Sequence, residues 1–221
     1  MLKVTYQDVK ESEVIRTYIR KADETLTALG FTEHSFAHVT KVAEAAGKLL
    51  SDLGYDSDTV ELARVAGYLH DIGNVINRID HAQSGAVMAF RLLDNMGADP
   101  EEIATVVTAI GNHDESTAFP VNPVAAALII ADKSDVRFTR VRNTADITAD
   151  IHDRVNYAVK KSELILSQDK KQLVLKLEID NTVCKVMEYF EIFMSRMLLC
   201  CKAAGKLGIE FKLDINGQQM L

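Results

Sequence analysis

Two polar motifs in this sequence directly follow apolar segments, and both carry side chains that bind divalent metals. His70 and Asp71 stand side by side in YLHDIGN, and Asp132 ends the apolar segment ALIIAD. Single histidines within or beside other helix-like segments complete a set of candidate ligands: His38, His81 and His113. Imidazole and carboxylate groups bind manganese, iron, nickel and zinc, and helical bundles commonly build metal sites from side chains on facing helices. The set predicts a metal centre inside a helical bundle.

Each histidine taken alone has a simpler interpretation, as a surface residue or a hydrogen-bonded core residue. The ordered pattern of histidines and aspartates supports the metal centre, and no single residue does. His152 and Asp153, in IHDRV, illustrate the difference because no apolar run precedes them. We therefore treat this second His-Asp pair as unrelated to the metal centre.

Apolar residues at three- and four-residue steps indicate helices over most of the first 145 residues. Gly30, Gly54 and Gly73 follow three of these segments, as glycine commonly does at the end of a helix. Pro123 stands at a favourable early position of the last one. The helical segments are 14–29, 35–53, 56–72, 84–97, 101–113 and 122–138.

The pattern changes after about residue 155. KQLVLKLEID alternates apolar and polar residues with the period of a half-buried strand, and YAVKKSELIL is its expected partner. A long helical segment, TVCKVMEYFEIFMSRMLLCCKAAGKLG, and a last strand, IEFKLDI, follow. We predict a mainly α protein with a helical domain over residues 1–150. A small α+β appendage of β-β-α-β order over residues 151–221 would serve oligomerisation, cover the site or set specificity.

Composition and charge narrow the partners. A net charge of -7 on a 24.5 kDa chain disfavours nonspecific binding to nucleic acid or anionic membranes. No run approaches the roughly 18 apolar residues of a membrane span, and the charged first residues are unlike a signal peptide. Three cysteines, an odd number, do not indicate a disulfide framework. We expect a cytoplasmic protein without a membrane partner or a sequence-specific nucleic-acid partner, and the C-terminal region is a candidate surface for a homo-oligomer.

The order of the motifs resembles that of the HD-domain metal-dependent phosphohydrolase superfamily. The matching segments are HVTKVAEAAG from His38, YLHDIGN with His70 and Asp71, HAQSGA from His81, GNHD with His113 and IIADKSD with Asp132. Together they are similar to the H…HD…H…H…D series of the members that bind two metals. The resemblance covers about residues 31–142 and implies an HD-type helical bundle.

The resemblance also implies metal ligands. A first divalent ion would be bound by four residues: His38, His70, Asp71 and Asp132. Two further histidines would complete a second site, with Asp71 as the bridge: His81 and His113. Either one or two ions would be bound, and manganese, iron, nickel, cobalt, zinc and magnesium all remain candidates because similar ligands accept several ions.

His34 competes with His38 for the place of the first ligand. The two are four residues apart and would share a helix face if the helix has already begun at His34. His38 is followed by the apolar positions Val39, Val42 and Ala43 in the order typical of the family, so we choose His38. His34 is then expected to contact the substrate or to lie near the entry of the site.

A cationic segment, DKSDVRFTRVR, begins at Asp132. Its basic residues are expected to bind phosphate oxygens or, alternatively, to form a solvated helix face: Lys133, Arg137, Arg140 and Arg142. Asp135 resembles the second acid of the family's last motif and is expected to orient a water molecule or Lys133. Asp114 stands where some two-metal members carry another histidine, so its role is open. Direct parts in catalysis are expected for Asp71, Asp135 and Lys133.

These features predict a metal-dependent phosphohydrolase that cleaves a phosphomonoester or phosphoanhydride, of a nucleotide or dinucleotide, with metal-activated hydroxide. The charge of the metal would explain how a protein of net charge -7 binds phosphate. Two alternatives remain open: a di-iron oxygenase of the same superfamily, and a non-catalytic protein that senses metal or nucleotide. The substrate stays open because specificity depends on the shape of the pocket and not on the metal ligands.

Overall fold

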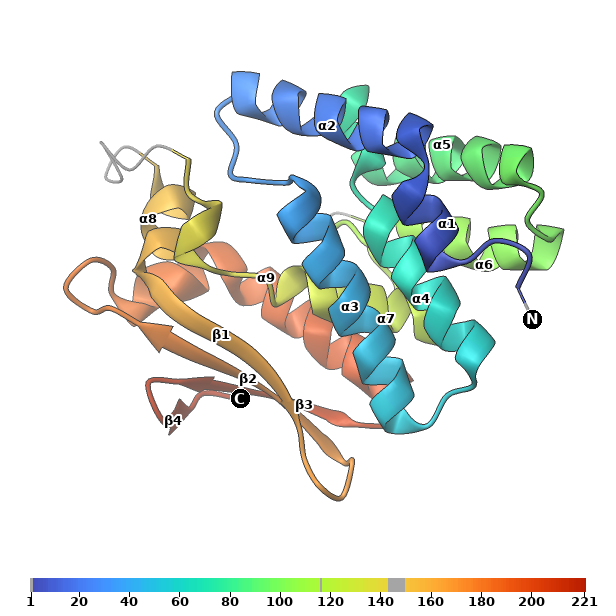
Figure 1. The fold of residues 1–221 in the computed structure, drawn as a ribbon. Helices are drawn as coiled ribbons and strands as arrows, with labels where there is room; N and C mark the ends of the chain where they lie inside the picture. The colour runs from blue at the N-terminus through green and yellow to red at the C-terminus, as the bar shows by residue number, and fades with distance from the viewer. Residues whose placement is uncertain (1, 116, 143–149) are drawn as a thin grey trace.

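The computed structural model describes residues 2–115, 117–142 and 150–221. Within these ranges the chain is mainly helical, with a small sheet in its C-terminal part (Figure 1). The helices before residue 143 are α1 (Tyr6–Glu11), α2 (Glu13–Ala28), α3 (Phe36–Leu53), α4 (Ser57–Leu69), η1 (Ile72–Val75), α5 (His81–Met96), α6 (Pro100–Gly111), α7 (Pro123–Lys133) and η2 (Phe138–Arg140). The prediction of a mainly α fold is confirmed.

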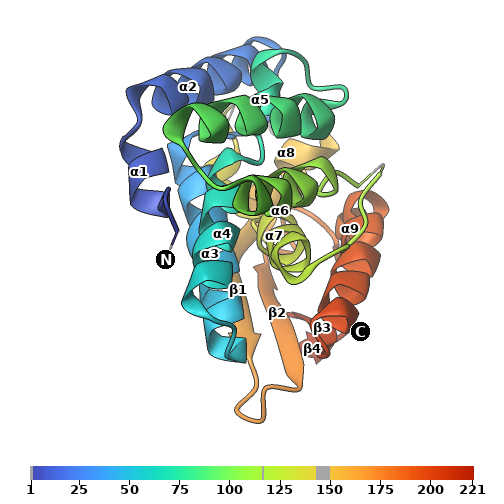
Figure 2. The ribbon, with the colours of Figure 1, turned by 90° about the vertical axis from the view of Figure 1, so that its right-hand side faces the viewer.

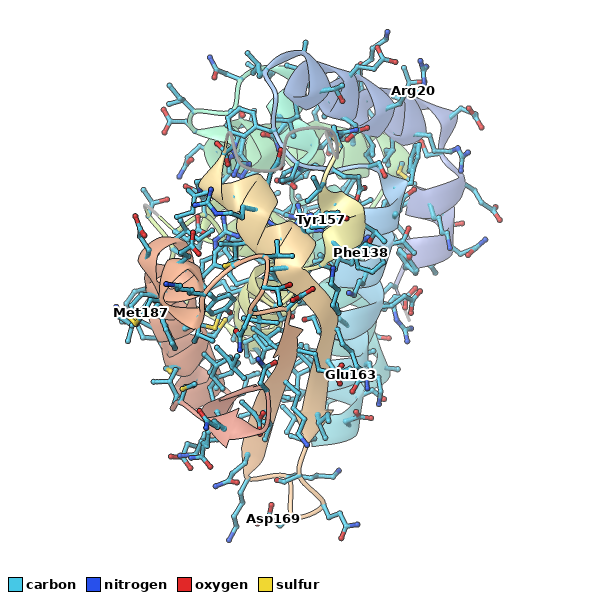
Figure 3. All side chains as sticks on the ribbon, turned by 90° about the vertical axis from the view of Figure 1, so that its left-hand side faces the viewer. Arg20, Phe138, Tyr157, Glu163, Asp169 and Met187 are labelled. Atoms are coloured by element: carbon cyan, nitrogen blue, oxygen red, sulfur yellow. The ribbon has the colours of Figure 1, made fainter. Side chains whose placement is uncertain are left out.

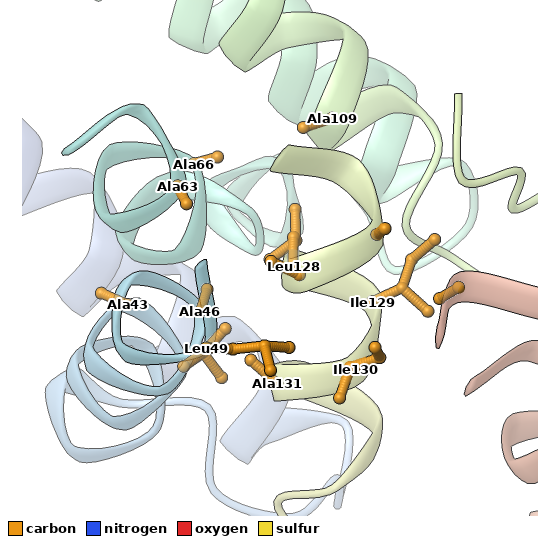
Figure 4. Packing of buried hydrophobic residues seen from close by; sticks show 14 of the residues in the cluster. Ala43, Ala46, Leu49, Ala63, Ala66, Ala109, Leu128, Ile129, Ile130 and Ala131 are labelled. Atoms are coloured by element: carbon orange, nitrogen blue, oxygen red, sulfur yellow. The ribbon is translucent and has the colours of Figure 1, made fainter. Parts of the chain in front are cut away.

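Helix α7 is the centre of the helical part. Every residue from Val124 to Ala131 is buried, and a helix that is apolar on all sides belongs inside a core. The side chain of Asn122 caps its start by accepting a hydrogen bond from the backbone of Ala125. Helices α3, α4 and α6 pack around α7 (Figures 2 and 4). The central helix therefore fixes Asp132, near its C-terminal end, among the helices that carry the histidines.

Two glycines set the spacing between elements that carry predicted ligands. A Cβ atom at Gly67 in α4 would lie 2.7 Å from the Cα of Ala43 in α3, so glycine permits the close approach of these helices. A Cβ atom at Gly73 would lie 2.1 Å from the carbonyl oxygen of His81. The absence of side chains at these two positions lets α3, α4 and the start of α5 converge.

The C-terminal part combines two helices with a four-stranded mixed sheet. Its elements are α8 (Ile151–Ala158), β1 (Val159–Leu166), β2 (Gln172–Ile179), α9 (Val186–Lys206), β3 (Glu210–Ile215) and β4 (Gln218–Gln219). The strand order is β1-β2-β3-β4; β1 and β2 are antiparallel, α9 connects the parallel pair β2 and β3, and β4 is antiparallel to β3. The predicted β-β-α-β order is confirmed, with β4 and α8 in addition.

The sheet and α9 pack against the helical part without a break in the core. Alternate residues of β2 are buried, from Leu173 to Ile179, as the period of two predicted. Helix α9 packs against α7 and β3, and one cluster of buried apolar residues runs from α1 to β3. The prediction that the partner strand begins at Tyr157 is wrong, because Tyr157 belongs to α8.

Figure 3 shows the molecule from the side of α8 and β1, with Met187 on the exposed face of α9 and Asp169 in the β1–β2 turn. The predicted domain boundary at residue 150 adjoins residues 143–149, which lie outside the described residues, and the division into two domains stays a prediction. In the described parts of the chain, no helix combines the length and the apolar character that a membrane crossing requires.

Candidate metal centre

Four buried histidines turn the same ring nitrogen, Nε2, toward a common space. Each opposite nitrogen, Nδ1, is hydrogen bonded to an acceptor: His38 to Asp135 Oδ2 at 2.8 Å, His70 to Gly67 O at 2.8 Å, His81 to Arg78 O at 3.0 Å and His113 to Ile110 O at 2.6 Å. Carbonyl and carboxylate oxygens only accept, so each Nδ1 carries the proton. Each Nε2 of a neutral ring then offers a lone pair, which is the arrangement that metal-binding histidines adopt.

The first group of ligand atoms joins α3, α4 and α7. His38 Nε2 lies 3.3 Å from His70 Nε2, 3.6 Å from Asp71 Oδ2 and 3.4 Å from Asp132 Oδ1. His70 Nε2 lies 3.2 Å from Asp71 Oδ2 and 3.7 Å from Asp132 Oδ1. The structure thus brings together the four residues that the sequence predicted for a first ion.

The second group joins Asp71 with the start of α5 and the end of α6. His81 Nε2 lies 3.2 Å from His113 Nε2, and both approach Asp71 Oδ1, at 3.4 Å and 4.0 Å. Asp71 therefore turns one oxygen toward each group, which is the geometry that a bridging carboxylate needs. The Oδ1 atom of Asp114 lies 4.0 Å from His81 Nε2, beside this second group.

The chemistry of these atoms fits a cation. Two contacts between Nε2 atoms, at 3.3 Å and 3.2 Å, place lone pairs against lone pairs in a buried space beside two carboxylates. Buried acceptors and buried negative charge are costly unless a donor or a cation compensates them. In each of three overlapping sets, the ligand atoms lie within 4.8 Å of one another: His38, His70 and Asp71; His70, His113 and Asp132; and Asp71, His81 and His113. Imidazole nitrogen and carboxylate oxygen suit the divalent ions expected from the sequence.

Both carboxylates are held in the ionised form. Burial raises the pKa of Asp71, but in the metal-free protein a proton on His70 Nε2, whose pKa Asp71 raises in turn, outweighs burial and holds the pKa of Asp71 well below its usual value. A bound ion would replace that proton. Burial likewise raises the pKa of Asp132, and the Lys133 ammonium outweighs it. Burial lowers the pKa of His113 to about 3. These acids are charged and His113 is neutral at pH 7, the protonation states that metal binding requires.

A cavity of about 400 Å³ opens over the centre. Asp71, His81, His113 and Asp132 form part of its wall. Four cationic side chains also line it: Arg78, Lys133, Arg140 and Arg196. The C-terminal part contributes to the wall through residues of α8 and α9, so both parts of the chain shape the space in front of the centre.

Some of the residues predicted to bind substrate line the cavity and others do not. Lys133 lines the cavity, 2.7 Å from Asp132 Oδ2 and 3.4 Å from Glu115 Oε1, and although burial lowers its pKa, these carboxylates raise it overall. His34 also lines the cavity, with Nε2 4.0 Å from Asp71 Oδ2. It precedes α3, which begins at Phe36, so the shared helix face with His38 does not form.

Arg140 and Arg137 hold the loop after α7. Arg140 lines the cavity, but its Nε and Nη1 atoms donate to the backbone oxygens of Glu33 and Asp135, at 3.0 Å and 2.9 Å. Arg137 pairs with Asp135 and Glu33 and is absent from the cavity wall that the described residues form. Arg142 donates to Phe31 O and pairs with Asp23. All three arginines are thus paired with other residues of the protein.

Asp135 has a different place from the one expected for it. Its Oδ2 accepts the Nδ1 proton of His38, and its Oδ1 lies 2.8 Å from Lys41 Nζ and 2.9 Å from Arg137 Nε. It is buried behind His38 and is not part of the cavity wall described here. The structure thus places Asp135 against His38, a candidate ligand, and the expected role of Asp135 toward Lys133 or a water molecule stays a prediction.

Sequence reasoning missed two arginines of the cavity. Arg78 stands three residues before His81, and its closeness to a predicted ligand was an available signal. Arg196 gives no local signal, because α9 reaches the cavity only through the tertiary fold. His152 and Asp153, set aside as unrelated to the metal centre, line the outer cavity but belong to none of the candidate ligand groups among the described residues.

Comparisons with known proteins find a known domain in this chain. Residues 35–137 match the family model for the HD domain. An uncharacterized protein of Methanocaldococcus jannaschii is 24% identical over 204 residues, which cover 81% of this chain and 77% of that protein. The ribonuclease Y proteins of Fervidobacterium nodosum and Latilactobacillus sakei are 32% and 39% identical over 105 and 79 residues, or 46% and 34% of this chain.

The matched segments cover only 18% and 13% of the two ribonuclease Y chains. A predicted HD superfamily hydrolase from an uncultured Thermotogales bacterium, known from a crystal structure, is 25% identical in sequence to this chain. The two structures superpose with a TM-score of 0.43 over 59% of this chain and 73% of that chain. The segment that matches the HD model contains every histidine and aspartate of the buried cluster. The chain therefore contains an HD domain, over residues 35–137.

Proposed function

We propose that this protein is a metal-dependent phosphohydrolase that cleaves a phosphomonoester or phosphoanhydride of a nucleotide or dinucleotide. One observation carries the proposal: two groups of buried ligand atoms share Asp71 and lie at the wall of a cavity that basic side chains also line. A divalent ion held there supplies a Lewis acid and lowers the pKa of bound water from 15.7 to about 7.

The protein's own residues would hold the phosphate in place. Lys133 is buried and lies 2.7 Å from Asp132 Oδ2, so its ammonium group stands at the edge of the first ligand group. Charge-assisted hydrogen bonds from lysine and arginine to phosphate oxygens are among the stronger polar contacts in proteins. Asp135 keeps the Nε2 lone pair of His38 facing the centre through its bond to Nδ1.

The size of the cavity favours a small substrate. A volume of about 400 Å³ lies within the usual range for small-molecule sites. The net charge of -7 supplies no general attraction for a long nucleic acid. The name ribonuclease Y nevertheless makes an RNA phosphodiester a reasonable substrate to test, because part of this chain is similar to those proteins.

The test is a substrate screen with a defined metal content. The purified protein is loaded separately with Mn²⁺, Fe²⁺, Co²⁺ or Ni²⁺ and incubated with nucleoside mono-, di- and triphosphates, dinucleotides and short RNA. Release of phosphate or nucleotide is compared with that of Asp71→Ala, which removes the carboxylate shared by both ligand groups. We expect turnover of at least one small nucleotide by the wild type and none by the variant.

The proposal fails if no metal form releases product above the Asp71→Ala level. Oxygen consumption by the iron form, without phosphate release, would support the oxygenase alternative instead. Tight nucleotide binding without turnover by the fully loaded protein would support a sensing role.

A further inference from the structure

Arg78 stands directly beside the second ligand group. Its Nη1 atom lies 3.4 Å from His81 Nε2, 3.4 Å from Asn74 Oδ1 and 3.9 Å from Asp71 Oδ1. The side chain is 28% exposed and lines the cavity, and its guanidinium carbon lies 5.8 Å from the ring centre of Phe31. The second ligand group therefore already has a cation from the protein itself at its edge.

Arg78 contacts the nitrogen of His81, Nε2, that would bind an ion. The Nδ1 proton of His81 is donated to the carbonyl oxygen of Arg78, so His81 Nε2 has one lone pair and no proton. Arg78 Nη1 lies 3.4 Å from this nitrogen, within reach of a hydrogen bond to the lone pair. A single lone pair cannot accept a hydrogen bond and coordinate an ion at the same time, so Arg78 and an ion at the second group exclude each other from His81.

Asn74 is hydrogen bonded to both Asp71 and Arg78. Its Nδ2 atom donates to Asp71 Oδ1 at 2.9 Å and fixes the oxygen that faces His81 and His113. Its Oδ1 atom accepts from Arg78 Nη1. The arginine is thus held by two contacts of 3.4 Å, by the charge of Asp71 at 3.9 Å and by the ring of Phe31, at the edge of the cavity.

We propose that Arg78 has two alternating partners. Without an ion at the second group, it compensates the lone pair of His81 and the charge of Asp71. When His81, His113 and Asp71 hold an ion, Arg78 would turn into the cavity, where its guanidinium would bind a phosphate oxygen. The phosphate part of this inference rests on the proposed function, whereas the competition for His81 does not.

Removing Arg78 therefore has opposite effects on two ligands. Two positive charges a few ångströms apart repel each other strongly in a partly buried site. Replacing Arg78 with an uncharged side chain therefore strengthens the binding of the second ion. The same change removes a charge-assisted contact to phosphate. A side chain with only a structural role would weaken the binding of both ligands when it is removed, so the opposite signs identify the mechanism.

The experiment compares Arg78→Met with Arg91→Met, which removes the same charge from an exposed site in α5 outside the described cavity wall. Metal stoichiometry and affinity are measured by equilibrium dialysis with elemental analysis, using Mn²⁺ or Co²⁺. We expect Arg78→Met to bind the second ion at least tenfold more tightly, with the first ion unchanged. Inorganic phosphate, titrated with both sites saturated, is expected to bind at least tenfold more weakly, and Arg91→Met is expected to match the wild type.

Arg78→Lys keeps a positive charge and is expected to lie between wild type and Arg78→Met for both ligands. The inference is overturned if Arg78→Met binds the second ion no more tightly than wild type, if both proteins bind only one ion, or if phosphate binding is unchanged. These binding measurements need no turnover. A failure of the proposed function would instead be seen as absent hydrolysis in the substrate screen, so the two failures are distinguishable.

Discussion

The role of Asp135 can be tested by exchanging its carboxylate for an amide of the same shape. In Asp135→Asn, the amide NH₂ faces either the Nδ1 proton of His38 or the two cations at the other oxygen, Lys41 and Arg137. The first arrangement drives His38 to the tautomer with a proton on Nε2, which removes its lone pair from the metal centre. The second leaves a donor against positive charges. Neither arrangement preserves the native hydrogen bonds.

The expected loss of metal affinity is ten- to a hundredfold, the usual effect of removing the partner of a metal-binding histidine, or about 1.4–2.7 kcal/mol. The free energy of unfolding should fall by roughly 3 kcal/mol, because the Asp135 side chain is only 1% exposed and hydrogen bonds to charged groups contribute about 1.5–3 kcal/mol. The Lys41 side chain is 44% exposed, so we discount its share for solvent screening. For a chain of this size, the melting temperature should fall by roughly 6–12 °C.

The assay is competitive metal titration together with thermal unfolding and ¹⁵N NMR of the histidine rings. Lys41→Met serves as the matched control, because it removes a cation from Oδ1 of Asp135 but leaves the bond from Oδ2 to His38. Its metal affinity should stay within about threefold of wild type, since the hydrogen bond that orients the ligand remains. The reasoning is refuted if Asp135→Asn keeps wild-type metal affinity, or if Lys41→Met loses as much.

Three further predictions concern the cavity, pH and the metal. Arg196→Met should lower kcat/KM for a nucleotide by about tenfold, because one contact to a charged group is lost; Arg154→Met, which breaks an ion pair with Glu188, is the control in steady-state assays. The pKa of His113 is about 3 in the folded protein, below its ordinary value of 6.5. Between about pH 3 and pH 6.5, His113 therefore binds more protons in the unfolded chain than in the folded one. The stability of metal-free wild type should therefore fall as pH drops from about 6.5 toward 3, and urea titrations should show a smaller fall for His113→Asn. When the free metal concentration is a hundred times the Kd, the bound metal should add about 2.7 kcal/mol to the free energy of unfolding. Chelation should therefore lower the melting temperature by roughly 5–11 °C in calorimetry. An unchanged melting temperature would contradict a bound ion.

Local patterns were sufficient to predict α2 to α7, α9 and the order of the candidate ligands. They did not predict α1 or α8, and the helix expected over 122–138 ends at Lys133. The apolar spacing in α3, α4 and α7 and the alternation in β2 are properties of neighbouring residues, which sequence displays directly. The same holds for His70 and Asp71, which follow the last turn of α4. Element ends were less certain, as at Tyr157, where a helix continues into residues expected to form a strand.

Only the tertiary structure decided what the remaining polar residues do. Asp135 lies 97 residues from His38 in sequence, yet their side chains share a hydrogen bond because α3 and the end of α7 pack together. Arg196 reaches the cavity from α9, which no spacing in the sequence connects to the ligands. The sequence by itself determined which side chains could bind a metal, since ligand chemistry belongs to the residue type. Which of their atoms meet, and which cations stand beside them, follows from helix packing, because contacts of a few ångströms depend on how distant segments approach one another.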